Sequence, residues 1–570
     1  MRLRRWIVAL LVAAAACGNG NGSPADSLDA DAGGEEAEVE AGDVAEDAPD
    51  VVEEGDAAEA EADVPPPDPC PVLGLARRAF VVAPDDDALY ATAADLTLET
   101  ADGPWILREN WSGCEVYLFI QDVPRQSEGE PTTLWSRDLR TLFQRAPRNT
   151  QLFFMSTSRF ETSRQDAIAG LRTLVEAAIG AMTPGDQAWW TPRVHYLPDQ
   201  AAAQPAWLGR LMAAPSWGVG IDRFQRLRYI GSYADYRRYN AARGWFDSNL
   251  SMAANEARYY NFEADREAAL EAEGATVVRL FDGTEASDPG STGVRSYADV
   301  TLPDAASLAT FDTMELDLFL DCVGAGEFGT CPAWDYIASL YICSPTDPAS
   351  CDVEFGRWIT TYHREGRWVH DVSGLLPLLA DGGTRRFAFY TQQLYAVTLD
   401  LRLSNAAKPA RPFDTVALWT GGPLDASYDS LHSTLTVTVP ADATKVELAT
   451  VLSGHGGVLP SNCAEFCNVT HHFLVNGHDN VRDFPETATQ DGCMDQVEQG
   501  TVPNQYGTWW YGRGGWCPGK EVPFVVVDIT SQVTLGAANV FEYRADVGGS
   551  PYTEGPGANI DLLSWLVLSR

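Results

Sequence analysis

The second half of the chain carries short runs in which apolar and polar residues alternate. Of the patterns in the sequence, this one most restricts the folds that the chain can adopt. Runs such as Lys445–Leu452 and Leu562–Leu568 are separated by turn residues and long polar loops. Successive side chains of a strand point to opposite faces, so this alternation is typical of strands with one buried face. Residues 283–570 are therefore predicted to be all-β, as a sandwich or jelly roll. Because this stretch is long for one sandwich, we expect two, over residues 283–408 and 409–570.

Residues 70–282 instead mix helix and strand patterns. Cys114–Gln121 is predicted to be a buried strand, and Glu256–Glu273 a helix that leads into a strand at Ala275–Phe281. Strands that alternate with helices favour an α/β layer fold, and the order of these elements resembles the thioredoxin fold. A redox role needs a reactive thiolate, but Asp122-Val123-Pro124-Arg125 stands where the redox motif would follow the first strand. We therefore expect a redox-inactive accessory or docking domain, or a structural appendage.

The N-terminus has the pattern of an export signal. Three arginines among the first five residues precede an apolar run, Trp6–Ala16, that is too short to span a bilayer. The run ends in small residues directly before Cys17, which resembles the lipobox of bacterial lipoproteins. We predict that residues 1–17 are a lipoprotein signal peptide and that Cys17 is lipidated. Ordinary cleavage nearby, with Cys17 discarded, is the alternative.

Residues 18–69 carry the most uneven charge in the chain, with 18 Asp and Glu and no Lys or Arg. Such a segment cannot bury enough apolar area to offset its chain entropy, so we predict a disordered acidic linker. With a lipidated Cys17, it would tether an exported body to the outer membrane or cell surface of a Gram-negative bacterium. A solubilising tail is the alternative. The whole chain has 80 acidic and 40 basic residues, which excludes a nucleic-acid partner because phosphate binding needs clustered Lys and Arg.

Eleven cysteines indicate the compartment and the cross-links. If Cys17 carries lipid, ten remain, and an even number in an exported chain predicts disulfides. Short spacings suggest three pairs, and two more pairs are left over, although spacing alone leaves other connectivities open. The pairs are Cys322–Cys331, Cys343–Cys351, Cys463–Cys467, Cys493–Cys517 and Cys70–Cys114. The sequence contains no Cys-x-x-Cys pair and no His at finger spacing, so no metal site is predicted.

Three short segments combine charged residues with Cys or Trp. They are Cys331–Tyr336 (CPAWDY), Cys463–Cys467 (CAEFC) and Tyr511–Gly519 (YGRGGWCPG). A disulfide across Cys-x-x-x-Cys closes a very small ring and would hold Glu465 with little freedom, as preorganisation for catalysis or sugar binding requires. Asp335 beside Trp334 is a pairing typical of carbohydrate sites. Taken singly, an acid beside a Trp is more often a solvated surface residue.

Together these segments resemble the peptide-N-glycosidase F family. The resemblance covers most of residues 310–530 and includes FGRWITTYH, FAFYTQ and VLSGHGG in the same order. It implies two adjacent antiparallel jelly-roll domains with an active site in the cleft between them. It also implies the pairs Cys322–Cys331, Cys463–Cys467 and Cys493–Cys517. The implied activity is hydrolysis of the amide between GlcNAc and Asn, which releases N-glycans from glycoproteins or glycopeptides, by a monomer that needs no cofactor.

The resemblance also assigns roles to particular residues. Asp335 is implied as the general base or as the group that orients water, and Arg513 as the stabiliser of the oxyanion. Glu465 is implied to bond the chitobiose hydroxyls or the amide nitrogen. Residues implied to contact the substrate are Trp334, Gln392, His455 and Trp516. Two of these depart from the family, because Gln392 stands where the family has a carboxylate and His455 where it has a Trp.

Three alternatives remain at this point. The β half could bind N-glycans without cleaving them, as the loss of a carboxylate at Gln392 favours. A two-carboxylate glycosidase could use Asp335 and Glu465. Paired jelly rolls also resemble copper monooxygenases, which need several imidazoles around the metal. That alternative is weakened because His471 and His472 are neighbours on a predicted strand and point to opposite faces.

Overall fold

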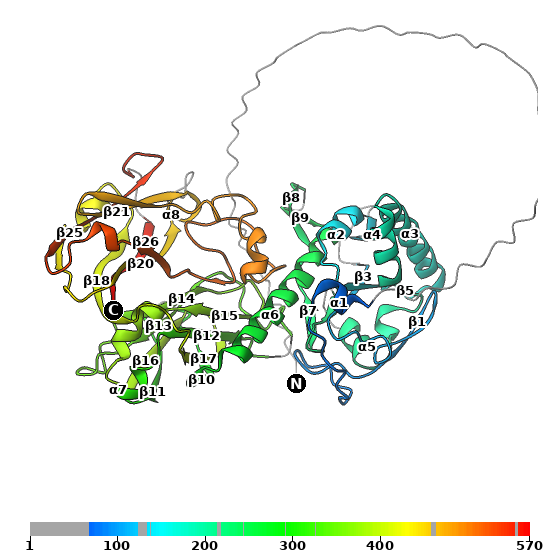
Figure 1. The fold of residues 1–570 in the computed structure, drawn as a ribbon. Coiled ribbons are helices and arrows are strands. Elements are labelled where there is room, and N and C mark those ends of the chain that lie inside the picture. Colours follow the sequence, from blue (N-terminus) through cyan, green and yellow to red (C-terminus); the bar gives the residue numbers. More distant parts are fainter. Residues whose placement is uncertain are drawn as a thin grey trace, which may run out of the picture. The chain divides into compact units, whose positions relative to one another are not determined.

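The computed structural model describes residues 68–122, 134–136, 138–213, 218–242, 244–290, 292–324, 326–457, 463–552 and 557–570. The described chain is mainly β and contains several domains, with an α/β region first (Figure 1). The predicted signal peptide, Cys17 and all but the last two residues of the predicted linker lie outside these ranges, as do residues 123–125 of the segment that replaces the redox motif. Among the described residues, no helix combines the length and apolar character needed to cross a membrane.

The α/β region is built on one five-stranded sheet. In the order of the sheet, its strands are β5 (Val194–Leu197), β4 (Thr150–Met155), β3 (Val116–Gln121), β6 (Gly218–Ile221) and β7 (Leu227–Ile230). β3, β4 and β5 are parallel, and β6 and β7 form an antiparallel hairpin beside β3. Every residue of β3 is buried, as expected for a strand whose two faces are both covered.

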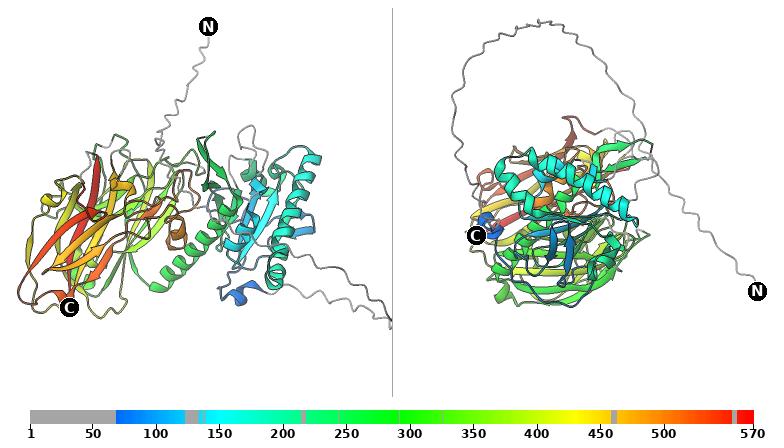
Figure 2. Two further views of the ribbon diagram at one scale, coloured as in Figure 1. Left: turned by 90° about the horizontal axis from the view of Figure 1, so that it is seen from above. Right: turned by 90° about the vertical axis from the view of Figure 1, so that its right-hand side faces the viewer.

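Helices cover both faces of this sheet (Figure 1, Figure 2). They are α2 (Leu139–Arg145), α3 (Glu161–Gly180), α4 (Pro184–Trp190), α5 (Ala206–Ala213) and α6 (Ala253–Glu273). Leu118 of β3 shares an apolar core with Leu171 and Val175 of α3. The next residue, Phe119, belongs to a second core that contains Trp207 of α5. The period of two along one strand thus separates two cores.

Shorter elements complete this region. A helical turn, α1 (Pro69–Leu73), precedes two antiparallel ribbons, β1 (Thr97–Thr100) with β2 (Gly103–Ile106) and β8 (Ala234–Asn240) with β9 (Trp245–Ser248). α6 packs closely on the sheet, because a Cβ added at Gly220 of β6 would lie 2.7 Å from the Tyr260 ring.

The first part of the β half consists of two antiparallel sheets. One has the order β10 (Thr276–Ala286), β17 (Tyr395–Ser404), β12 (Thr313–Asp321) and β15 (Gly366–Asp371). The other has the order β11 (Ser296–Leu302), β16 (Gly383–Thr391), β13 (Ile337–Ile342), β14 (Val353–Ile359) and β23 (Lys520–Glu521), with the short helix α7 (Ala305–Leu308) nearby in sequence. The strand expected at Ala275–Phe281 therefore pairs with β17 and not with the α/β sheet.

The second part repeats this arrangement. One sheet has the order β18 (Pro412–Pro423), β26 (Ala558–Ser569), β20 (Lys445–Gly456) and β24 (Val525–Asp528). The other has the order β19 (Leu435–Thr438), β25 (Ala538–Val547), β21 (Val469–Val475) and β22 (His478–Arg482), and α8 (Cys463–Phe466) precedes β21. β21 alternates strictly between buried and partly buried residues, as its sequence predicted. Its buried apolar residues, Val469, Phe473 and Val475, join a core that includes Leu566.

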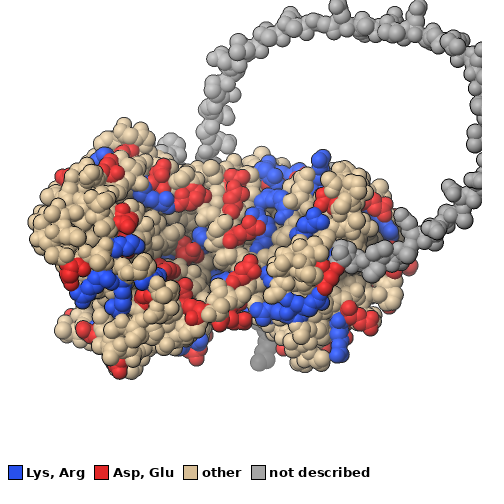
Figure 3. Space-filling view, in the orientation of Figure 1, with Lys and Arg blue, Asp and Glu red and all other residues tan. Residues whose placement is uncertain are grey.

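Covalent links and ion pairs complete the fold. The five predicted disulfides are confirmed: Cys70–Cys114, Cys322–Cys331, Cys343–Cys351, Cys463–Cys467 and Cys493–Cys517. On the face drawn in Figure 3, Lys and Arg side chains are interspersed with Asp and Glu. Many charged side chains of the described residues are paired, as between Arg386 and Asp299 at 2.7 Å, and exposed pairs of this kind contribute little stability.

Candidate active site

The three predicted catalytic side chains meet around one buried guanidinium. Nη2 of Arg513 lies 3.4 Å from Oδ2 of Asp335, and Nε of Arg513 lies 3.6 Å from Oε1 of Glu465. Asp335 precedes β13, Glu465 lies in α8, and Arg513 precedes β23. Segments that are far apart in the sequence therefore place two carboxylates on one cation. Only 1% of the Arg513 side chain is exposed.

Four residues that had no predicted role complete the surroundings of Arg513. Its Nη2 donates to the Tyr362 hydroxyl and to Oγ1 of Thr508, each at 3.3 Å. Its Nη1 donates to the Tyr511 carbonyl at 2.9 Å, and the Phe466 ring centroid lies 4.7 Å from its Cζ. A planar guanidinium with this many partners has little freedom to turn. Tyr362 lies within the family motif FGRWITTYH, which was the one sequence signal for it.

The backbone around Glu465 explains why glycines flank these motifs. Gly514 N donates to the Glu465 carbonyl at 2.6 Å, and Gly454 N donates to the Gly514 carbonyl at 2.7 Å. A Cβ added at Gly454 or Gly514 would lie 2.0 or 2.3 Å from the Ala464 carbonyl oxygen. Gly456 N also donates to Oε2 of Glu465 at 3.1 Å. The Glu465 carboxylate is therefore held by the backbone as well as by the small disulfide ring.

Gly514→Ala is expected to lower the free energy of unfolding by about 1–3 kcal/mol, the usual cost of inserting a methyl group where no space exists. The added Cβ meets a backbone oxygen at 2.3 Å, so the chain itself must move. Chemical denaturation measures the change. Gly185→Ala is the matched control, because nothing lies within 4 Å of its added Cβ. Equal midpoints for the two variants would contradict the close contact.

A cavity of about 720 Å³ adjoins the two acids, a volume within the range of small-molecule sites. The predicted site residues in its lining are Asp335, Glu465, Gln392, His455 and Trp516. The rest of the lining comes from both parts of the β half, including Tyr341 from the first and Asn559 from the second. Arg513 lies behind the acids. Trp334 is not in the lining, and 55% of this residue is exposed.

A second buried ion pair lies in the wall of the cavity away from Arg513. Nε and Nη2 of Arg357 lie 2.7 and 2.8 Å from the two carboxylate oxygens of Glu354. Nη1 of Arg357 also donates to Oγ of Ser453 at 2.9 Å and to the Asp561 carbonyl at 2.6 Å. This arginine thus joins β14 to β20 and β26. Sequence reasoning missed it, although a charged residue inside the otherwise buried run of β14 is a signal for such a role.

His455 and Trp516 form one stacked unit in this cavity. Their ring centroids are 5.1 Å apart with planes at 27°, and Nε2 of His455 lies 2.8 Å from Oγ of Ser453. Burial, together with the nearby charge of Arg357, lowers the pKa of His455 to about 3. The imidazole is therefore neutral near pH 7 and serves as a hydrogen-bonding group, and not as an acid.

The charges around Arg513 oppose one another. Burial raises the pKa of Asp335 and of Glu465, while the neighbouring Arg513 lowers both and does not fully offset the rise. Burial alone would lower the pKa of Arg513, but Tyr362, Asp335 and Glu465 raise it on balance. The site therefore combines a permanent cation with two carboxylates of increased basicity.

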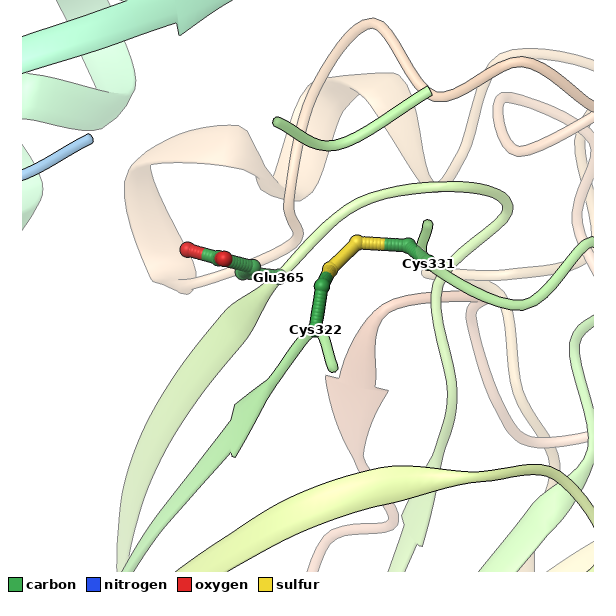
Figure 4. A group of neighbouring side chains, drawn as sticks. All are labelled: Cys322, Cys331 and Glu365. Carbon is green, nitrogen blue, oxygen red and sulfur yellow. A yellow bond between two sulfur atoms is a disulfide. The ribbon is translucent and has the colours of Figure 1, made fainter. Parts of the chain in front are cut away.

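One group of potential metal ligands occurs within the described ranges, and it is not available as such. It consists of Cys322, Cys331 and Glu365, but the two sulfur atoms are joined in a disulfide with the Glu365 side chain beside it (Figure 4). The two neighbouring histidines of β21 have separate partners. Nδ1 of His471 lies 2.8 Å from the Tyr543 hydroxyl, whereas both ring nitrogens of His472 lie within 2.9 Å of carboxylate oxygens.

In the comparison with known proteins, the second part of the β half matches a family model. Residues 425–567 match the family model described as peptide-N-glycosidase F, C terminal. Over 292 residues the chain is 25% identical to peptide-N(4)-(N-acetyl-beta-D-glucosaminyl)asparagine amidase F of Elizabethkingia miricola. The alignment covers 47% of this chain and 76% of that protein. The resemblance that the motifs predicted is confirmed.

Solved structures are also similar. That of PNGase F, a glycosylasparaginase from Flavobacterium meningosepticum, aligns with a TM-score of 0.44 at 20% identity and covers 52% of this chain and 96% of its own. That of PNGF-II aligns with a TM-score of 0.40 at 12% identity and covers 54% of this chain and 67% of its own.

Proposed function

We propose that this chain, a member of the peptide-N-glycosidase F family, hydrolyses the amide between the innermost GlcNAc and an Asn side chain, and so releases N-glycans from glycoproteins or glycopeptides. The observation that carries this proposal is the contact of Arg513 with both Asp335 and Glu465 beside the cavity. The products are a peptide with Asp in place of Asn and a glycosylamine that decays to the free sugar. The chain's own side chains supply the chemistry of this proposal.

The mechanism has to activate both water and the amide. Asp335 accepts the proton of the attacking water or orients it, and the raised pKa of its carboxylate makes it a better base than an exposed Asp. Electrostatic support comes from the permanent charge of Arg513. Because 1% of that side chain is exposed and its Nη1 and Nη2 already have hydrogen-bond partners, its burial favours holding the acids over direct contact with the oxyanion. Its Nε has no hydrogen-bond partner among the described residues and lies 3.6 Å from Oε1 of Glu465.

The remaining cavity residues suit a sugar. Glu465 carries acceptors for chitobiose hydroxyls or for the amide N–H, and Gln392 supplies a neutral amide in the lining. The stacked His455 and Trp516 offer an aromatic surface, and sugars pack their C–H faces on such surfaces. Trp334 is exposed outside the lining, so it suits the peptide side of the substrate better than the glycan.

The test is product analysis on a denatured N-glycoprotein. Release of a glycan with both core GlcNAc residues, together with Asn-to-Asp conversion in the peptide, supports the amidase. A peptide that retains one GlcNAc indicates a glycosidase that uses the two acids. Binding on a glycan array without release indicates the glycan-binding alternative, which the amide of Gln392 in place of a carboxylate favours.

The activity is expected to fall at acidic pH, on a limb whose midpoint lies above 3.8. Burial raises the pKa of Asp335 above its ordinary value of 3.8, and a base must be deprotonated to act. Protonation of this group favours the folded state, because its folded pKa exceeds its unfolded one. Unfolding driven by Asp335 is therefore not the cause of the limb. A pH profile of kcat/KM measures it, and a profile flat to pH 3.8 would contradict the role.

We also propose the finer fold and the location. The strand orders β10-β17-β12-β15 and β11-β16-β13-β14, repeated in the second part, support two eight-stranded jelly rolls. The order β5-β4-β3-β6-β7 with its antiparallel hairpin supports a thioredoxin-like α/β domain. A crystal structure with other strand orders would contradict both.

The location rests on the sequence of the N-terminus. We propose a monomer anchored through a lipid on Cys17 to the outer membrane or cell surface, with residues 18–69 as the tether. Light scattering tests the monomer. Protease treatment of intact cells tests the surface location, and a protein resistant on intact cells but cleaved in lysates would contradict it.

A further inference from the structure

We propose that Glu256 of the α/β region is a positioning residue for the active site, acting through Arg364 on the segment that carries Tyr362. The α/β region is then a working part of the enzyme and not an appendage. This inference rests on the proposed function. It requires that α6 reach the segments that surround Arg513, and that the contact be specific to those segments.

Glu256 and Arg364 belong to a buried ionic cluster. Nη1 of Arg364 lies 2.7 Å from Oε1 of Glu256, and its Nε lies 2.9 Å from Oε2 of Glu327. The remaining donors of Arg364 bond the Pro503 and Tyr229 carbonyls at 2.7 and 3.0 Å. Exposed fractions are 0% for Glu256 and 3% for Arg364. A buried cation that loses one anionic partner destabilises the folded state strongly. A change at Glu256 is therefore expected to shift the Arg364 side chain.

The first segment held by this cluster carries Tyr362 to the site. Tyr362 stands two residues before Arg364, and its hydroxyl accepts from Nη2 of Arg513 at 3.3 Å. The same hydroxyl also lies against Asp335. Burial raises the pKa of the Asp335 carboxyl, and the charge of Arg513 and then the hydrogen bond with Tyr362 lower it in part. A shift of Arg364 therefore reaches both the cation and the proposed base through Tyr362.

The second segment, residues 502–508, carries Thr508 and is held by the same carboxylate oxygen. Nδ2 of Asn504 donates to Oε1 of Glu256 at 3.0 Å, and Asn504 adopts φ of +51°, a conformation that few residues except Gly, Asn and Asp accept. The backbone of Tyr362 makes two hydrogen bonds to this segment. Its N–H donates to Oε1 of Gln505 at 2.9 Å, and its carbonyl accepts from N of Tyr506 at 3.2 Å. Both segments that support Arg513 thus converge on one atom of α6.

The backbone of the α/β region makes a second, independent contact at this place. Ser232 N donates to the Asn504 carbonyl at 2.6 Å, and Gly231 N donates to Oε1 of Glu256 at 3.0 Å. A Cβ added at Gly231 would lie 2.1 Å from the Asn504 carbonyl oxygen and 2.9 Å from Nη1 of Arg364. The glycine is therefore required for this close approach.

The same helix also supplies a matched control. Further along α6, Glu267 pairs with Arg367 of β15 at 2.6 Å, and Arg266 donates to the Arg367 carbonyl at 2.7 Å. These contacts dock α6 on the β half, but Arg367 pairs with Asp317 and does not contact the residues around Arg513. Loosening the docking alone should affect the Glu256 and Glu267 sites alike.

The experiment compares Glu256→Gln with Glu267→Gln in the full chain on a denatured glycopeptide. Glu256→Gln keeps the shape and an acceptor but removes the charge opposite Arg364. We expect kcat to fall on the order of 10- to 100-fold, as displacements of about 1 Å do, with KM within about threefold because no cavity residue is touched. Glu267→Gln should keep its kcat. Equal losses in both variants, or full kcat in Glu256→Gln, would overturn the proposal.

A second variant and a second readout cover the other outcomes. If Glu256→Gln does not fold, Gly231→Ala replaces it, with Gly170→Ala as control because nothing lies within 4 Å of that Cβ. Hydrogen exchange should rise in peptides containing Tyr362 and Thr508 in either test variant and in neither control. If the wild type releases no glycan, the proposed function is refuted, and hydrogen exchange alone then tests whether Glu256 positions these segments. Unchanged hydrogen exchange in the test variants would overturn the positioning role.

Discussion

Asp335→Asn is expected to lower kcat/KM for glycan release by on the order of 10³-fold, within the range that a general base contributes. The amide keeps the size of the side chain and can still accept from Nη2 of Arg513, but it cannot take a proton from water. The cavity is otherwise unchanged, so glycopeptide binding should persist. Single-turnover kinetics and binding of the glycopeptide to the variant measure the two effects separately.

The same substitution should change the free energy of unfolding little, because two effects oppose each other. Arg513 loses one of its two anionic partners and keeps Glu465. Burial raises the pKa of Asp335, which means that the folded protein favours the neutral form of this side chain, and Asn is neutral. Asp299→Asn is the control, because Asp299 forms an exposed pair with Arg386 and neither residue lines the cavity. Glycan release by Asp335→Asn at the wild-type rate would exclude Asp335 as the base. A large loss of thermal stability would instead attribute lost activity to misfolding.

Arg513→Leu is expected to abolish activity and to lower the free energy of unfolding by about 3–5 kcal/mol, the cost of leaving buried charges without their partner. Asp335 and Glu465 both depend on this guanidinium, and Tyr362 and Thr508 lose their donor. Arg513→Lys restores the charge but has no planar fork to reach these partners together, so stability should recover more than activity. Denaturation curves and glycan release compare the two variants.

The pH dependence separates this explanation from a simple packing defect. Without Arg513, the pKa of each acid should rise further, because Arg513 is what lowers it in the wild type. The deficit in stability should then shrink as pH falls and the acids become protonated. Arg279→Leu, at an exposed pair with Asp400, should cost less than about 1 kcal/mol. A deficit that does not change with pH would contradict the charge argument.

The sequence motifs predicted that Asp335, Glu465 and Arg513 belong to one site, and the three side chains do lie together. Their catalytic roles stay predictions. The ring of Cys463 and Cys467 and the glycines beside Arg513 are local features, and their spacing is visible in the chain. Tyr362 and Arg357 were not assigned because their roles arise from partners that are distant in sequence. Arg357, for example, bonds Ser453 and the Asp561 carbonyl, and nothing near residue 357 indicates either contact.

The fold shows the same limit. Alternation correctly predicted a mainly β second half, since a strand with one buried face has a period of two. The strand beginning at Thr276 was nevertheless expected in the α/β region, because it follows a helix directly in sequence. Its partner is β17, where Thr276 stands opposite Leu403. A strand's own residues show that it is a strand, but its sheet is set by a partner that a local pattern does not contain.

The disulfides have a consequence for how the protein is handled at the bench. Glycoproteins are commonly opened for deglycosylation with a thiol reductant, and here the Glu465 loop is closed by Cys463–Cys467 while the Asp335 loop begins at the Cys322–Cys331 bond. A reductant carried over from the substrate would reduce these two disulfides and so loosen the loops that position both acids. Substrate should therefore be reduced, alkylated and freed of thiol before the protein is added, and expression should be directed to an oxidising compartment.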